Sequence, residues 1–197
     1  MYPAIYLASQ SPRRSQLLGQ LGVSHELLLA DATEDAEALE QPIAGESPQT
    51  YVQRVTRLKL DAALQRLQRR GLPPRPVLCA DTTVALGPTM YAKPADSADA
   101  LRMLRELAGL SHVVLTAVAI GTAQQVEQAC SVSEVRFADI GEAELAAYVA
   151  SGEPMGKAGA YAIQGAAAAF VAHISGSYTG IMGLPLFETA QLLKRLA

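Results

Sequence analysis

The sequence predicts an α/β fold with a mixed sheet, and three observations support that class. Apolar runs typical of strands and apolar patterns typical of helices alternate along the whole length of the 197 residues. Half of the residues are hydrophobic and 18% are charged, which suits a substantial core and excludes a disordered chain. No internal repeat or linker-like segment divides the sequence. We therefore expect one domain over residues 1–197, and two lobes within it are compatible with the pattern.

The first elements are a strand and a helix joined by a polar turn. Residues 4–8 form an apolar run typical of a buried strand. Ser11-Pro12 then begins a helix, because serine is a favoured N-cap and proline fits the first helical position. The apolar face of this helix carries Leu17, Leu18 and Leu21, and Gly22 ends it.

A second strand fits residues 25–30, and it overlaps an acidic segment. Residues 26–46 hold seven acidic residues and no basic one, which together with Pro42 and Gly45 is typical of a loop. Ser47-Pro48 begins a long helix that continues to about Arg70, because apolar residues recur there at helical spacing.

The second half of the chain alternates strands and helices. An apolar run over 77–86 is interrupted by Asp81, whose charge is costly inside a strand unless it has a partner. The pattern predicts a helix over 96–108, and residues 156–183 are rich in Gly and Ala with little regular period. The pattern also predicts two strands joined by a short turn, at 112–121 and 125–137. Two more helices are predicted, one at 142–150 and one from about Pro185 onward.

The charge balance limits what the chain can bind. It has 16 basic and 19 acidic residues, a formal net charge of −3, whereas a nucleic-acid or anionic-membrane binder needs a basic excess. The longest apolar runs are too short to span a bilayer. Two cysteines without metal-binding spacing, and no signal-peptide pattern, favour a reducing, cytoplasmic location. An anionic ligand therefore needs a local cluster of positive charge.

The turn Ser9-Gln-Ser-Pro-Arg-Arg14 is one candidate for such a cluster. It joins a predicted strand to a helix N-terminus, where free amides and the helix dipole favour an anion. Arginine is also suited to bidentate phosphate contact. The alternative is a capped helix with two surface arginines. The turn matches neither common nucleotide-binding glycine motif.

A second candidate is the basic segment between residues 51 and 75, which holds seven basic residues and one acid. The simplest interpretation of most of them is a solvated helix face. Lys59 differs, because it lies one residue from the apolar row Val52, Val55 and Leu58 and so can point into a cleft.

Asp81, followed by two threonines, is the best single candidate for a catalytic or metal-binding carboxylate. Mg²⁺ takes oxygen ligands and is commonly bound by one or two carboxylates together with substrate phosphates. The alternative is a structural aspartate that accepts hydrogen bonds from nearby amides. Lys93-Pro94 adds a basic residue on a rigid turn, which is weak evidence by itself.

Several short motifs follow one another along essentially the whole chain. They are Leu7-Ala-Ser-Gln-Ser-Pro-Arg-Arg-Ser-Gln-Leu-Leu18, Ala80-Asp-Thr82 with Lys93-Pro94, Gly152-Glu-Pro, Lys157-Ala-Gly-Ala-Tyr-Ala-Ile-Gln-Gly165, and Gly176-Ser-Tyr178 through Gly183-Leu-Pro-Leu186. These motifs, in this order, resemble the Maf family of nucleotide pyrophosphatases.

The resemblance implies a twisted mixed sheet with helices on both sides, two lobes around a central cleft, and usually a homodimer. It implies hydrolysis of a nucleoside triphosphate between its α and β phosphates, with Mg²⁺ or Mn²⁺. Arg13, where the 7-methyl-GTP branch of the family carries Trp, and Gln164 resemble the branch that acts on dTTP and UTP.

The resemblance also assigns roles to individual residues. Asp81 matches the family's proton acceptor, and Glu34 matches a carboxylate suited to hold metal with Asp81. Positions that set base selectivity match Arg13, Thr82 and Gln164. Polar and basic positions around the triphosphate match Ser9, Arg14, Lys59, Lys93 and Lys157.

Two other functions stay open at this point. One is a related pyrophosphatase that acts on 7-methyl-GTP, CTP or a modified pyrimidine nucleotide. The other is a division-regulating binding protein, which needs a partner surface rather than a polar cleft.

Overall fold

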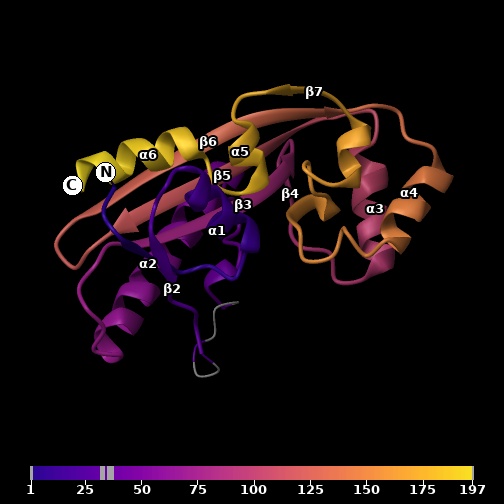
Figure 1. Ribbon diagram of the computed structural model, residues 1–197. Helices are drawn as coiled ribbons and strands as arrows, with labels where there is room; N and C mark the ends of the chain where they lie inside the picture. The colour runs from indigo at the N-terminus through magenta and orange to yellow at the C-terminus, as the bar shows by residue number, and fades with distance from the viewer. Residues whose placement is uncertain (1, 32–33, 35–37, 197) are drawn as a thin grey trace.

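The computed structural model describes residues 2–31, 34 and 38–196, and these contain seven strands in one sheet (Figure 1). The strands are β1 (Ile5–Leu7), β2 (His25–Leu27), β3 (Val77–Leu86), β4 (Thr89–Tyr91), β5 (Ser111–Gly121), β6 (Val126–Phe137) and β7 (Val171–Ser175). Their order is β2-β1-β3-β5-β6-β7, with β4 also paired to β3. β1 is parallel to β2 and β3, whereas the other pairs are antiparallel. The predicted α/β class with a mixed sheet is confirmed.

Helices and short 3₁₀ turns connect the strands. The α-helices are α1 (Pro12–Gln20), α2 (Pro48–Arg69), α3 (Ser97–Leu107), α4 (Glu142–Ala150), α5 (Tyr178–Met182) and α6 (Leu186–Arg195). The 3₁₀ turns are η1 (Ala38–Glu40), η2 (Ala158–Ala160) and η3 (Ala166–Phe170). Among the helices described, none is both long and apolar enough to cross a membrane.

The element bounds agree with the sequence pattern where the local signal is strong. α2 begins after Ser47, whose Oγ accepts a hydrogen bond from the Thr50 amide at 3.2 Å, as an N-cap should. The predicted strand at 25–30 is shorter, because only His25–Leu27 pairs with β1. The irregular segment 156–183 contains η2, η3, β7 and α5, and β4 is an addition to the predicted elements.

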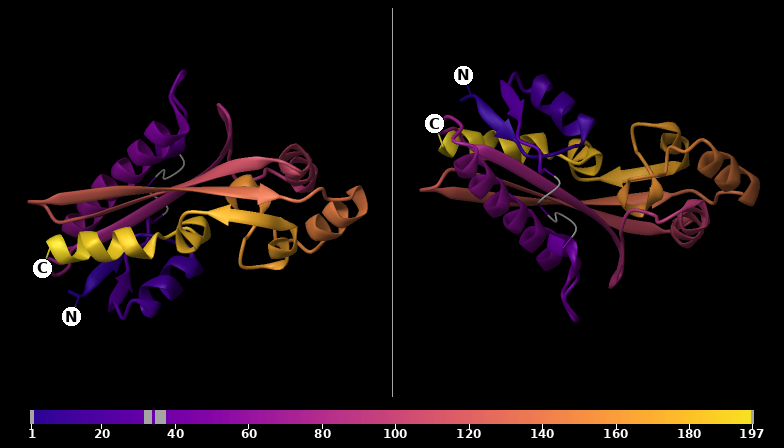
Figure 2. Two further views of the ribbon diagram at one scale, coloured as in Figure 1. Left: turned by 90° about the horizontal axis from the view of Figure 1, so that it is seen from above. Right: turned by 90° about the horizontal axis from the view of Figure 1, so that it is seen from below.

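Helices cover both faces of the sheet at the end that holds the chain termini (Figure 2). Along β3, Leu78 and Ala80 pack into a core with α1 and α6, while Val77 and Cys79 pack against α2. This alternation follows from the two-residue period of a strand. It explains why the predicted strand over 77–86 is almost continuously apolar, since both of its faces are buried.

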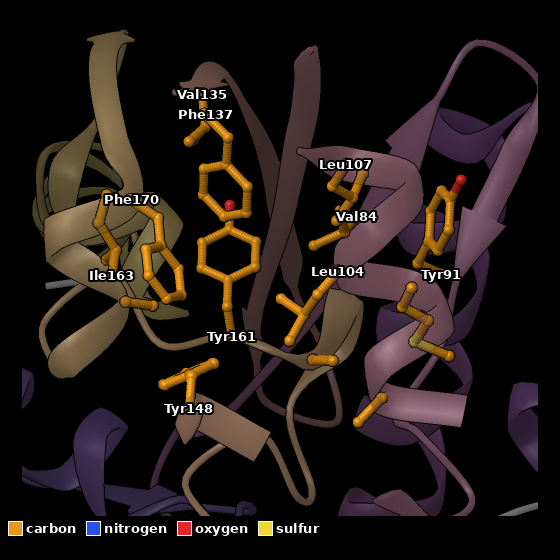
Figure 3. Packing of buried hydrophobic residues seen from close by; sticks show 14 of the residues in the cluster. Val84, Tyr91, Leu104, Leu107, Val135, Phe137, Tyr148, Tyr161, Ile163 and Phe170 are labelled. Atoms are coloured by element: carbon orange, nitrogen blue, oxygen red, sulfur yellow. The ribbon is translucent and has the colours of Figure 1, made fainter. Parts of the chain in front are cut away.

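A second core lies at the opposite end of the long strands, where α3 and α4 pack beside the strands (Figure 1). It is rich in aromatic side chains, with Phe137 in edge contact with both Tyr161 and Phe170 (Figure 3). The two cores form two lobes that share β3, β5 and β6.

A histidine is buried among these aromatic rings and should make stability depend on pH. His112 is 2% exposed, and its Nε2 lies 2.9 Å from the Tyr161 hydroxyl. Burial lowers the pKa of His112 from 6.5 to about 4. The unfolded chain therefore binds a proton below pH 6.5 that the folded chain binds only near pH 4. Acidification through this range consequently favours unfolding.

We expect the free energy of unfolding to fall by about 3 kcal/mol between pH 7 and pH 4 because of His112. Urea unfolding at several pH values would measure it. The control is His112→Gln, which does not titrate in this range and keeps a polar group near Tyr161. Equal pH dependence in the two proteins would contradict the prediction.

Candidate active site

A cleft of about 1020 Å³ lies between the two lobes. Its wall is formed by the β1–α1 turn, η1, one side of α2, the middle of β3, the segment after β4, the start of η2 and the end of α5. Of the residues that the sequence singled out, the cleft is lined by Ser9, Arg13, Arg14, Glu34, Lys59, Asp81, Thr82, Lys93 and Lys157. A smaller hollow of about 420 Å³ lies elsewhere, beside the outer surface of α2, and contains none of them.

The open edge of β3 explains why a carboxylate is tolerated in the middle of this strand. β1 pairs with β3 only at Val77 and Leu78, and β4 pairs with it only from Val84 to Leu86. Among the described strands, none covers that edge between the two pairings. Asp81 lies in this gap and therefore lines the cleft.

Asp81 and Glu40 share one ammonium group. The Nζ atom of Lys59 donates to Asp81 Oδ1 at 2.6 Å and to Glu40 Oε1 at 2.6 Å. Burial opposes the charge on Lys59, but the two carboxylates outweigh it and raise its pKa. Lys59, which the sequence placed beside the apolar stripe of its helix, therefore points into the cleft.

Glu40 is the functional candidate that the sequence does not single out. Burial raises its pKa, but Lys59, with smaller contributions from Lys93 and Arg14, outweighs burial and lowers the pKa overall. A hydrogen bond holds the backbone of Glu40 in place, because the Tyr51 hydroxyl donates to the Glu40 carbonyl at 2.8 Å. Within an acidic segment, no spacing signal distinguishes this carboxylate from its neighbours.

The described acids of residues 26–46 form ion pairs with basic residues of α2 and of the turn after it, in antiparallel order. Acids late in this stretch pair with basic residues near the start of the helix, and acids early in the stretch pair with basic residues near or beyond its end. In the described residues the pairs are Glu46 with Arg54, Glu40 with Lys59, Glu34 with Arg66 and Arg69, Asp31 with Arg70, and Glu26 with Arg75. Most of the bases between 51 and 75 are therefore paired with acids rather than simply solvated.

Glu34 lies in the cleft wall but next to guanidinium groups. Its carboxylate accepts from Arg66 at 2.6 and 2.8 Å and lies 3.1 Å from Arg69. The hydrogen bond from Arg66 is the main reason that its pKa is lowered. The carboxylate that shares a partner with Asp81 is Glu40, not Glu34.

The β1–α1 turn carries two arginines whose side chains donate to backbone carbonyls of residues near the C-terminus. Arg14 Nε donates to the Gly183 carbonyl at 2.8 Å, and Arg13 Nε donates to the Met182 carbonyl at 3.3 Å. Arg14 Nη1 also donates to Ser9 Oγ at 3.1 Å. Ser11 precedes α1 as predicted but makes no side-chain capping bond. These contacts fix the direction of both guanidinium groups before any ligand arrives.

Lys157 and Lys93 complete the basic lining. Lys157 Nζ donates to the Glu153 carbonyl at 2.6 Å, and burial, helped by nearby Arg13, lowers the pKa of Lys157.

The turn η2, which follows Lys157, packs tightly on β3. Its Gly159 has a φ of +69°, and a Cβ there would lie 2.9 Å from the Val84 side chain. Only glycine allows so close an approach.

Gln164 does not reach the cleft. It is exposed and lies beyond Tyr161, outside the residues that form the cleft wall. The structure thus brings Arg13 and Thr82 together in the cleft but leaves the third predicted selectivity residue on the surface of the loop.

The carboxylates of the cleft fit a hard divalent cation. Asp81 and Glu40 offer oxygen ligands close together, as their shared contact with Lys59 shows. Among the described residues there is no group of three or more His, Cys, Asp or Glu side chains that could hold a metal. Two carboxylates suit Mg²⁺ or a similar ion that takes its other ligands from phosphates and water.

Comparisons with known proteins identify the family of this chain. The family model described as "Maf-like protein" matches residues 4–196. A dTTP/UTP pyrophosphatase of Albidiferax ferrireducens is 67% identical over 190 residues, covering 96% of this chain and 95% of the relative. A dTTP/UTP pyrophosphatase of Ralstonia nicotianae is 63% identical and covers 100% of this chain and 95% of the relative.

A further relative and one solved structure complete the comparison. The dTTP/UTP pyrophosphatase of Cupriavidus metallidurans is 62% identical over 98% of this chain and 97% of its own length. The Ham1 protein of Staphylococcus aureus aligns with 69% of this chain and 72% of its own at 13% identity, with a TM-score of 0.43. Because the family pattern is matched from residue 4 to residue 196, the chain belongs to the Maf family.

Proposed function

We propose that this protein is a nucleoside triphosphate pyrophosphatase that hydrolyses dTTP and UTP to the monophosphate and pyrophosphate. The observation that carries the proposal is Asp81 beside Lys59 in a cleft lined by further basic side chains from separate segments. Relatives named dTTP/UTP pyrophosphatase, 62–67% identical over nearly the full length, support the choice of substrate.

Asp81 acts as the proton acceptor in this proposal. A water molecule attacks the α-phosphorus, its proton passes to the Asp81 carboxylate, and the bond between the α-phosphorus and the bridging oxygen breaks. Pyrophosphate leaves with that oxygen. Proton transfer to a positioned carboxylate contributes typically 10²- to 10⁴-fold to such a rate.

The basic side chains stabilise the charge of the phosphates. Lys59, Lys93 and Lys157 can approach the phosphates as point charges, and Arg14 can offer two parallel donors. Because Arg14 and Lys157 are already held by carbonyl groups, little reorganisation is needed when the substrate binds. Ser9, which accepts from Arg14, positions that guanidinium.

We propose Asp81 and Glu40 as the residues that would hold the divalent cation. Glu34 is the other candidate, but its carboxylate is engaged by two arginines. When bound with the substrate, Mg²⁺ or Mn²⁺ would neutralise phosphate charge. We further propose a homodimer, as the family resemblance implies, and a cytoplasmic protein of one domain, as the sequence pattern indicates.

The test is the product pattern of the purified protein with Mg²⁺ or Mn²⁺. We expect dTTP and UTP to give monophosphate and pyrophosphate, faster than CTP, GTP or 7-methyl-GTP. In ¹⁸O-labelled water the label should enter the monophosphate, because attack is at the α-phosphorus. Label in the pyrophosphate, or no pyrophosphate from any nucleotide, would refute the proposal.

A further inference from the structure

The hydroxyl of Thr82, in the cleft wall, belongs to a hydrogen-bond chain that runs into the core. Thr116 faces Thr82 across the β3–β5 pairing, and their Oγ1 atoms lie 2.9 Å apart. Thr116 is fully buried, and its Oγ1 lies 2.7 Å from the carbonyl oxygen of Gly180, in α5. The chain thus joins the cleft to a backbone carbonyl through a threonine with no access to water.

The direction of this chain follows from simple chemistry. A carbonyl oxygen can only accept, so the single hydroxyl proton of Thr116 is donated to Gly180. Thr116 must then accept in its contact with Thr82, and Thr82 must donate. With its only proton used in this way, the Thr82 oxygen can offer nothing but lone pairs to a ligand in the cleft.

The family resemblance assigns Thr82 to a position that sets base selectivity, and an acceptor at that position would distinguish the pyrimidine bases. Uracil and thymine carry a hydrogen on N3 next to the carbonyl oxygen O4, whereas cytosine has a lone pair on N3 next to an amino group. Thr82 as an acceptor matches the N3–H group and opposes the cytosine lone pair. Arg13, which lies in the same cleft wall and can only donate, matches O4 and opposes the cytosine amino group.

We propose that Thr116 is a positioning residue that sets base specificity by taking the proton of Thr82. Thr82 then reads the N3–H group of uracil or thymine and disfavours cytosine. This inference rests on the proposed dTTP/UTP pyrophosphatase activity and adds a residue that acts from the core.

The test compares UTP with CTP in Thr116→Val. Valine has a similar shape but cannot accept the Thr82 proton, so Thr82 becomes free to donate to cytosine N3. We expect the ratio of kcat/KM for UTP to kcat/KM for CTP to fall about tenfold or more. Thr116→Ser keeps the hydroxyl and should retain the ratio. The matched control is Thr189→Val, because Thr189 is also fully buried and donates to a backbone carbonyl, that of Pro185.

Two further measurements keep the result independent of turnover and of folding. Binding of the α,β-methylene analogues of UTP and CTP, measured by calorimetry, should show the same change of ratio. If Thr116→Val does not fold, Thr82→Val serves instead: it removes the acceptor, so it should weaken UTP binding and strengthen CTP binding.

The outcomes separate this inference from the proposed function. If the unmodified protein hydrolyses UTP but Thr116→Val slows UTP and CTP by the same factor, the inference is overturned and the function stands. If the unmodified protein hydrolyses neither UTP nor dTTP, both are overturned.

Discussion

Asp81→Asn should lower kcat for dTTP and UTP by about 10³-fold, because an amide cannot take the proton of the attacking water. Asparagine keeps the shape of the side chain and an oxygen that can accept from Lys59, which donates to Asp81 at 2.6 Å. The substitution also removes a negative charge from a cleft that must bind a triphosphate. We therefore expect binding of the substrate to persist while turnover is lost.

The measurement is pyrophosphate release, together with calorimetric binding of α,β-methylene-UTP and thermal unfolding. Asp61→Asn is the matched control, since Asp61 is a carboxylate paired with Arg57 on the exposed side of α2. We expect it to leave kcat within about twofold, because an exposed ion pair contributes little. A kcat for Asp81→Asn within tenfold of the unmodified protein would remove Asp81 from the role of proton acceptor.

The sequence predicts the sheet and helices well where local signals are strong. Ser47-Pro48 marks the start of α2, and the alternation of buried faces accounts for the apolar run around Leu78. It also identifies Asp81 as a charge that needs a partner. It does not reveal the gap in strand pairing that opens beside Asp81, because β1 and β4 reach that edge from distant parts of the chain.

The sequence alone does not show which carboxylate lies beside Lys59, or which of the predicted selectivity residues reach the cleft. Glu34 and Glu40 belong to one acidic segment, and only the turn held by Tyr51 decides that Glu40 meets Lys59. Gln164 matches a family motif, yet the irregular path of its loop leaves it exposed. Thr116 carries no signal in the sequence, because its role depends on which strand lies beside β3.

Lys59→Met should lower both activity and stability, since it removes the cation that Asp81 and Glu40 share. Each carboxylate has an oxygen 2.6 Å from the same Nζ atom, so these two oxygens lie within about 5 Å of each other. Their side chains are only 14% and 33% exposed. Water therefore screens their repulsion poorly once the ammonium group is gone.

We expect kcat/KM for UTP to fall at least about 100-fold, because one pre-positioned charge for the phosphates is lost. The free energy of unfolding should fall by about 2 kcal/mol, less than the roughly 3–5 kcal/mol of a fully buried pair, because part of the site is open to water. Arg57→Met is the matched control on the same helix. Its side chain is 49% exposed and its pair with Asp61 should contribute under about 1 kcal/mol.

The double variant Lys59→Met with Glu40→Gln separates the two effects. Removing the second negative charge should restore about half of the lost stability, because Asp81 then faces a neutral amide. Activity should not return with it, since the ammonium group that meets the phosphates is still missing. A double variant no more stable than Lys59→Met would show that Glu40 and Asp81 do not repel each other. Glu40 would then lose its place beside Asp81 as a candidate for holding the metal.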